Sequence, residues 1–329
     1  MSIGALFTRL VDLLPEPSRR AQSVIAALVV LSQGLIAVTG AIVRVTASGL
    51  GCPTWPQCFP GSFVPVAHAE VPRIHQAIEF GNRMVTFLVV ATAIAAVLAV
   101  TRAHRRREVL VYAWLMPAST VLQAVLGGIT VRTGLLWWTV AIHLLVSMSM
   151  VWLATLLFIK VGEPDDGVPV RVVPAALRGL TAVSAVTLAA VLVTGTMVTG
   201  AGPHAGDKSP DPDKAVPRLA VEITTLVHLH GGLLVAYLCL LVGLGFGLAA
   251  VRAPRRVRLR LGVLVGLVAL QGAVGVVQFQ NGVPAALVAV HVALAAAITA
   301  GTAAVWAVGK TREPIESDAA LLGTGVSTA

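Results

Sequence analysis

The sequence predicts an all-α integral membrane protein whose eight transmembrane helices form two pseudo-symmetric four-helix bundles. Of its 329 residues, 57% are hydrophobic and only 12% are charged, whereas soluble domains carry about 25% charged residues. Eight apolar runs are long enough to cross a bilayer, which takes ~20 helical residues. Runs of this length are expected to be helices, because lipid cannot satisfy an unpaired backbone. Motifs of the first half also recur in the second half.

The elements follow in order along the chain. Apolar residues at helical spacing predict a short surface helix near the start: Ile3, Leu6, Phe7, Leu10 and Leu14. The spans are predicted at 21–43, 78–100, 109–131, 135–159, 175–198, 223–250, 260–280 and 284–308. No cleavable signal peptide is expected, since the first run is long enough to remain as a span. We expect an N-terminal segment (1–20), a first bundle (21–160), a linker (161–174), a second bundle (175–309) and a tail (310–329).

The net charge of +9 is distributed unevenly between alternate loops. Seventeen of the 24 Lys and Arg residues fall on the side that carries both termini, in runs such as "RAHRRR" (102–107) and "RAPRRVRLR" (252–260). The positive-inside rule therefore predicts a multi-pass protein of the cell membrane with both termini cytoplasmic. We interpret the basic runs as topology signals and lipid-headgroup contacts, which argues against a nucleic-acid partner.

The repeat is visible in polar residues within apolar runs. Three pairs share an offset of 148 residues: Gln123 with Gln271, His143 with His291, and Asn82 with His230. The motifs "VTGAIV" (38–43) and "VTGTMV" (193–198) are offset by 155. Four helices followed by four in the same orientation predict two parallel repeats about an axis along the membrane normal.

Four of these residues are predicted to lie at a similar depth in the membrane. Asn82, His143, His230 and His291 lie roughly five to eight residues, or about 10 Å, inside the outer ends of their predicted helices. Facing helices can supply the two axial ligands of a haem iron, and His230 with His291 meet that requirement. Interhelical hydrogen bonding is the alternative for each one alone. His228 breaks the offset and is the less favoured ligand.

Three features together resemble one known family over the whole chain. They are "TGAIVRVTASGLGCPTWPQC" (39–58), "IEFGNR" (78–83) and the paired histidines of the fourth and eighth spans. The chain resembles the haem A synthases, which oxidise the C8 methyl group of haem O to a formyl group and so supply haem A to terminal oxidases. The resemblance implies that haem b is held by His230 and His291 while the first half binds haem O.

The resemblance also implies partners: a haem O-producing farnesyltransferase and oxidase assembly factors. The oligomeric state stays open, a homo-oligomer included. Many family members have Glu-x-x-His-Arg where this chain has Asn82 in place of the histidine. Asparagine is a poor iron ligand, so His143 is the one remaining histidine ligand for haem O. Either the first half is degenerate or its iron is five-coordinate, and the retained Glu79 and Arg83 favour the second interpretation.

Glu79 is the candidate catalytic carboxylate, together with His143 as the iron-binding group. It lies one turn before Asn82, so we expect it in the same cavity, where it could transfer a proton or stabilise positive charge. The alternative is an i,i+4 ion pair with Arg83. Three arginines are candidates for binding haem propionates: Arg83, Arg44 and Arg73. The alternative is that their side chains only extend to the membrane interface.

Cys52 and Cys58 in the first outer loop predict a disulfide. The disulfide would either hold a lid over the substrate site or take part in redox catalysis, and we favour the structural role. Cys239 is expected to serve packing only. Two other functions stay open: a b-type cytochrome subunit for electron transfer without catalysis, and a transporter whose histidines carry protons.

Overall fold

The computed structural model describes residues 3–207 and 215–313 and confirms all eight predicted spans. They are α2 (Arg19–Val45), α3 (Arg73–Arg102), α4 (Arg107–Arg132), α5 (Trp137–Val161), α6 (Ala175–Ala201), α7 (Ile223–Ala250), α8 (Arg255–Gln280) and α9 (Ala285–Val308). Each is long and apolar enough to cross a membrane. The largest differences are at the starts of α3 and α8, which begin five residues before the predicted positions 78 and 260. The chain is a multi-pass membrane protein.

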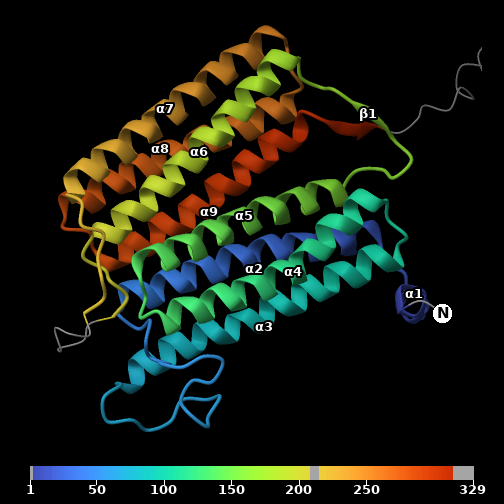
Figure 1. Ribbon diagram of the computed structural model, residues 1–329. Helices are drawn as coiled ribbons and strands as arrows, with labels where there is room; N and C mark the ends of the chain where they lie inside the picture. Colours follow the sequence, from blue (N-terminus) through green and yellow to red (C-terminus); the bar gives the residue numbers. More distant parts are fainter. Residues whose placement is uncertain (1–2, 208–214, 314–329) are drawn as a thin grey trace, which may run out of the picture.

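The helices form two groups side by side, α2–α5 and α6–α9 (Figure 1). Each group has its own apolar core, centred on residues such as Val29 and Met116 in the first and Tyr237 and Leu264 in the second. The groups meet where α9 packs against α2 and α5. Burial of these apolar faces against one another positions the polar residues described below.

The 148-residue repeat extends to the backbone of the turns. His104 (φ 47°) and Arg252 (φ 51°) follow α3 and α7, while Leu135 (φ 61°) and Val283 (φ 59°) precede α5 and α9. Non-glycine residues rarely adopt positive φ. Two such pairs at the repeat offset therefore show that the connections in the two groups are built alike.

The predicted surface helix is α1 (Ile3–Val11), which contacts α3 and packs the ring of Phe7 5.6 Å from that of Trp114. The prediction for Leu14 was wrong, because it lies beyond the helix. Pro15 follows it, and a residue that precedes proline is disfavoured in the α conformation.

Two short strands were not predicted. The linker contains β1 (Val168–Val170), which pairs antiparallel with β2 (Thr311–Glu313), so that Pro169 lies opposite Arg312. The predicted tail thus begins with a strand. Its remainder (314–329), like residues 1–2 and 208–214, lies outside the described residues.

Ion pairs hold the linker against the first helix group. Arg105 has a side chain only 1% exposed, and its Nε lies 2.8 Å from Asp165 Oδ2. Its Nη1 donates to Gln22 Oε1 at 2.7 Å, and Arg106 lies 2.7 Å from Glu163. The interpretation of the "RAHRRR" run as lipid-headgroup contacts was therefore wrong for Arg105, because its guanidinium donates to acceptors inside the protein.

Asp165 links stability to pH. Burial alone would raise the pKa of Asp165, but hydrogen bonds from Arg105 and Arg106 and the charges of Arg105 and Arg19 outweigh it, so its pKa lies below the usual 3.8. A carboxyl whose folded-state pKa is depressed stabilises the protein above the unfolded-state pKa, and this stabilisation is lost as the pH falls towards the folded-state value.

Asp165→Asn is therefore expected to lower the free energy of unfolding by about 1.5–3 kcal/mol at pH 7, the range for hydrogen bonds to charged groups. The difference from wild type should shrink below pH ~4. Thermal unfolding in detergent at both pH values measures this. Asp166→Asn is the control, because Asp166 is exposed; equal effects of the two variants would contradict the prediction.

Candidate functional site

His230 on α7 and His291 on α9 lie next to each other inside the second helix group. Their ring centroids are 6.2 Å apart and their planes are inclined by 47°. Imidazole–metal bonds of about 2 Å, added to the size of two rings, require a centroid separation of about 6 Å. The separation therefore fits two imidazoles that share one haem iron.

The ring of His230 is oriented by α6. Its Nδ1 lies 3.0 Å from the carbonyl oxygen of Val191 and 3.3 Å from Thr194 Oγ1. A proton on Nδ1, donated to that carbonyl, leaves Nε2 unprotonated, which is the state a metal ligand needs. A methyl group on Gly195 would lie 3.0 Å from His230 Cε1, so this glycine makes room for the ring.

His291 is held through its backbone, and its ring is short of partners. Its carbonyl oxygen accepts a hydrogen bond from Gln271 Nε2 at 3.1 Å. Its Nδ1 is buried and has no hydrogen-bond partner within the described residues. A buried polar atom left unpaired costs free energy. The arrangement thus suits a ring placed for a bound group better than one placed for packing alone.

The first helix group repeats this arrangement around His143 on α5. Gln123 Nε2 donates to the His143 carbonyl oxygen at 3.3 Å and to Ser147 Oγ at 2.6 Å. His143 Nδ1 is likewise buried and unpartnered among the residues described. A methyl group on Gly127 would lie 3.5 Å from its Cε1, as one on Gly275 would lie 3.4 Å from that of His291.

Asn82 on α3 occupies the position that His230 has in the second group. Its Oδ1 accepts a hydrogen bond of 2.6 Å from Thr39 Oγ1, just as Thr194 lies against His230. The amide oxygen of Asn82 is therefore already engaged. Of Asn82 and His143, only His143 offers an imidazole that could bind iron.

The threonines and glycines that contact these rings and Asn82 were not predicted from the sequence. Thr39 and Thr194 are the central residues of the two "VTG" motifs, and Gly127 and Gly275 stand four residues after Gln123 and Gln271. The internal repeat contained a signal for them, because the two threonines are offset by 155 residues, like their motifs, and the two glycines by 148, like the glutamines. The residue types alone could not identify these positions as neighbours of the histidines, because glycine and threonine are common in packed transmembrane helices.

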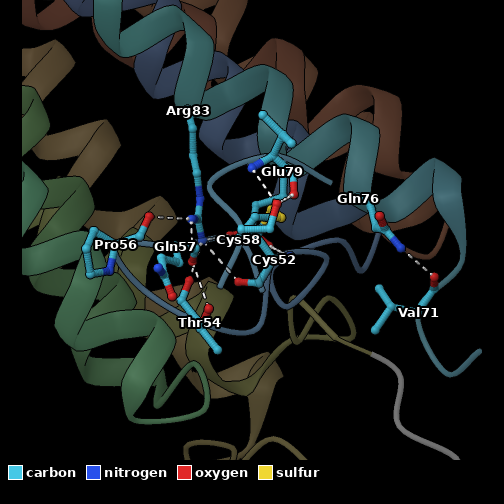
Figure 2. The surroundings of a disulfide bond; sticks show 11 residues. Cys52, Thr54, Pro56, Gln57, Cys58, Val71, Gln76, Glu79 and Arg83 are labelled. Atoms are coloured by element: carbon cyan, nitrogen blue, oxygen red, sulfur yellow. Dashed lines mark hydrogen bonds and ion pairs between the residues drawn. A yellow bond between two sulfur atoms is a disulfide. The ribbon is translucent and has the colours of Figure 1, made fainter. Parts of the chain in front are cut away.

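Glu79 and Arg83 on α3 contact the loop between α2 and α3 (Figure 2). Glu79 Oε1 lies 2.8 Å from Arg83 Nη2, so the predicted ion pair forms. Its Oε2 accepts a 2.6 Å hydrogen bond from the backbone N–H of Cys52. Arg83 also donates to carbonyl oxygens of the loop: those of Cys52, Thr54, Pro56 and Gln57.

The predicted disulfide between Cys52 and Cys58 is confirmed, and both cysteines are fully buried. The loop lies so close to α3 that a methyl group on Gly51 would be 2.2 Å from the His75 carbonyl oxygen. Trp55 packs on α4, where a methyl group on Gly128 would be 2.7 Å from its ring. The loop is thus fastened to both helices, and the backbone of Cys52 directly contacts Glu79.

Arginines hold the segment between α6 and α7 in place. Arg44 on α2 donates to the carbonyl oxygens of Thr199 (3.1 Å) and His204 (3.0 Å), and Arg218 also donates to Thr199 (2.8 Å). This segment meets the α2–α3 loop where the Gly49 N–H donates to the carbonyl oxygen of Gly206 at 2.7 Å. Arg44 therefore contacts the protein backbone and joins the two helix groups at the end where α2 and α6 finish.

Five further polar residues have other surroundings. His228 is exposed on α7, and Arg73 is exposed at the start of α3. His75 accepts or donates a 2.9 Å hydrogen bond with Ser48 Oγ, His68 stacks on Phe59, and Cys239 is a free, exposed cysteine.

Comparison with known proteins agrees with the resemblance. A family model described as "Cytochrome oxidase assembly protein" matches residues 23–300. The chain belongs to this family. Proteins named Heme A synthase are similar to this family member: that of Geobacillus kaustophilus is 32% identical over 102 residues, or 31% of this chain and 30% of the relative.

Two further relatives carry the same name. The Heme A synthase of Geobacillus thermodenitrificans is 30% identical over 108 residues, or 32% of each chain. That of Halalkalibacterium halodurans is 30% identical over 184 residues, or 54% of this chain and 59% of the relative. The chain thus spans between 30% and 59% of the length of these three relatives.

Proposed function

We propose that this protein is a haem A synthase, an oxidoreductase that converts the C8 methyl group of haem O to a formyl group. Family membership and the printed names of its relatives support the proposal. The observation that carries it is the pair of repeat-related sites: His230 and His291 with ring centroids 6.2 Å apart, and His143 in the equivalent place of the first group.

In this proposal the second bundle, residues 175–309, holds haem b between His230 and His291. When bound, the haem supplies one-electron transfer. The contribution of the protein is orientation: the Val191 carbonyl oxygen and Thr194 hold His230, and Gln271 holds the backbone of His291. The apolar helices around the rings exclude water.

The first bundle, residues 21–160, binds haem O, with His143 as its iron ligand. Asn82 leaves the opposite axial position without an imidazole, so we expect five-coordinate iron there. EPR spectra of protein loaded with haem O should then contain a high-spin signal besides the low-spin signal of the second bundle. Low-spin, bis-imidazole iron in both bundles would contradict this assignment.

Oxidation of a methyl group to an aldehyde takes two successive oxidations at the edge of the substrate macrocycle. Glu79 would accept a proton or stabilise positive charge at this edge, the usual work of a buried carboxylate near a reacting carbon. Arg83 acts as a positioning residue, because it holds both Glu79 Oε1 and the carbonyl groups of the disulfide loop.

We further propose that both termini are cytoplasmic in the cell membrane. The distribution of Lys and Arg supports this orientation, and it places the Cys52–Cys58 disulfide on the outer, oxidising side. A haem O-producing farnesyltransferase would supply the substrate, and oxidase assembly factors would receive haem A.

Expression in a host that makes haem O but no haem A tests the activity. Chromatography of extracted haems should reveal haem A with the wild-type protein and none with His143→Ala. A purified protein that carries haem but yields no haem A would contradict the proposal and indicate an electron-transfer subunit.

A further inference from the structure

We propose that a cavity between the two helix groups, at the end that carries the termini, binds the phosphate group of an anionic phospholipid. The cavity has a volume of about 320 Å³. The first helix group supplies part of its wall through α5 and the segment after it, and the second supplies α8, α9 and β2. It lies far along the helices from the histidines, so it plays no part in the proposed haem sites.

Arginines line one side of the cavity. Arg256 and Arg260 stand one turn apart on α8, which places them on one helix face. Arg312 comes from β2, and its Nη1 donates to the carbonyl oxygens of Gly167 (2.7 Å) and Asp165 (3.5 Å). These bonds and the pairing of β2 with β1 fix the position of Arg312. A guanidinium held this way can present its remaining N–H groups to a phosphate.

The acidic residue in the lining does not balance this charge. Glu163 is paired with Arg106 at 2.7 Å and with Lys160 at 3.0 Å. Arg260, by contrast, has no hydrogen bond or ion pair within the part of the chain that the structure describes. The cavity wall is therefore net positive, and like charges so close together favour a bound anion.

The rest of the wall favours a lipid over free phosphate. Phe158, Ile159, Ala307 and Val308 line the cavity, and Phe158 is 41% exposed. They provide an apolar surface for glycerol and acyl carbons next to the arginines. Basic pockets between transmembrane helices at the cytoplasmic surface are where anionic headgroups bind, and the orientation proposed above puts the cavity at that level.

Native mass spectrometry of the full-length protein in a neutral detergent tests the site. Phosphatidylglycerol, phosphatidylcholine and inorganic phosphate are titrated separately against wild type and variants. We expect wild type to bind phosphatidylglycerol about tenfold more tightly than phosphatidylcholine, and Arg260→Gln with Arg312→Gln to abolish the preference. Arg258→Gln is the matched control, because Arg258 lies on α8 but outside the cavity lining.

The single variant Arg260→Gln leaves the strand pair intact and should weaken the preference if the double variant does not fold. Equal binding of both lipids by wild type, or an unchanged preference in the Arg260 variants, would overturn the proposal. Displacement of phosphatidylglycerol by inorganic phosphate at similar concentration would overturn the assignment to a lipid. Haem content, measured in parallel, should not change in any of these variants.

Discussion

His230→Ala is expected to remove the low-spin haem from the second helix group, while the protein keeps its fold. The two rings lie 6.2 Å apart, so loss of one leaves a single imidazole where two were available. The space left by the ring adjoins Gly195, which has no side chain that could take the place of the imidazole. The ratio of haem to protein should fall to about half that of wild type, if each bundle binds one haem.

Haem extraction, together with EPR of the purified protein, measures this. His228→Ala provides the control on the same helix: His228 is exposed and two residues away, so its removal should leave the low-spin signal unchanged. His291→Ala should reproduce the effect of His230→Ala, because in the proposed site both residues bind the same iron. Loss of the signal in His228→Ala, with retention in His230→Ala, would reverse the ligand assignment.

Glu79→Gln is expected to lower haem A formation by at least about 10²-fold, the lower bound for a lost general acid–base group. Glutamine has nearly the same shape, and its amide oxygen can still accept from the Cys52 N–H. It cannot carry the negative charge that pairs with Arg83, nor accept a proton at neutral pH. The variant should therefore bind haem O and keep the loop, yet fail to convert the substrate.

Three measurements separate the catalytic role from a structural one. Haem A output reports conversion, haem content reports binding, and the rate of Cys52–Cys58 reduction by a thiol reports whether the loop stays closed. Arg83 keeps its hydrogen bonds to the carbonyl oxygens of Cys52, Thr54 and Gln57, so the reduction rate should match wild type. Glu70→Gln is the control, since Glu70 is exposed in the same loop between α2 and α3. Normal haem A output from Glu79→Gln would exclude the carboxylate from the chemistry.

Much of the molecule could be predicted from the sequence because its signals are local or repeated. Hydrophobic runs near bilayer length have to be helices in lipid, so the spans were found with end errors of at most five residues. The pairing of Gln123 with Gln271 and of His143 with His291 survives as the same glutamine-to-carbonyl hydrogen bond in both groups. The disulfide was predicted because its cysteines are near neighbours in the chain.

The sequence by itself determined the eight spans, their division by an internal repeat, and the residues that recur at one depth. Only the tertiary structure decided which groups these residues contact: Thr39 against Asn82, the Cys52 N–H against Glu79, and Asp165 against Arg105. The physical reason is the separation in sequence over which each kind of interaction acts. Transfer of apolar side chains into lipid acts along each segment separately, whereas hydrogen bonds and ion pairs form between segments whose approach is set by the packing of every helix at once.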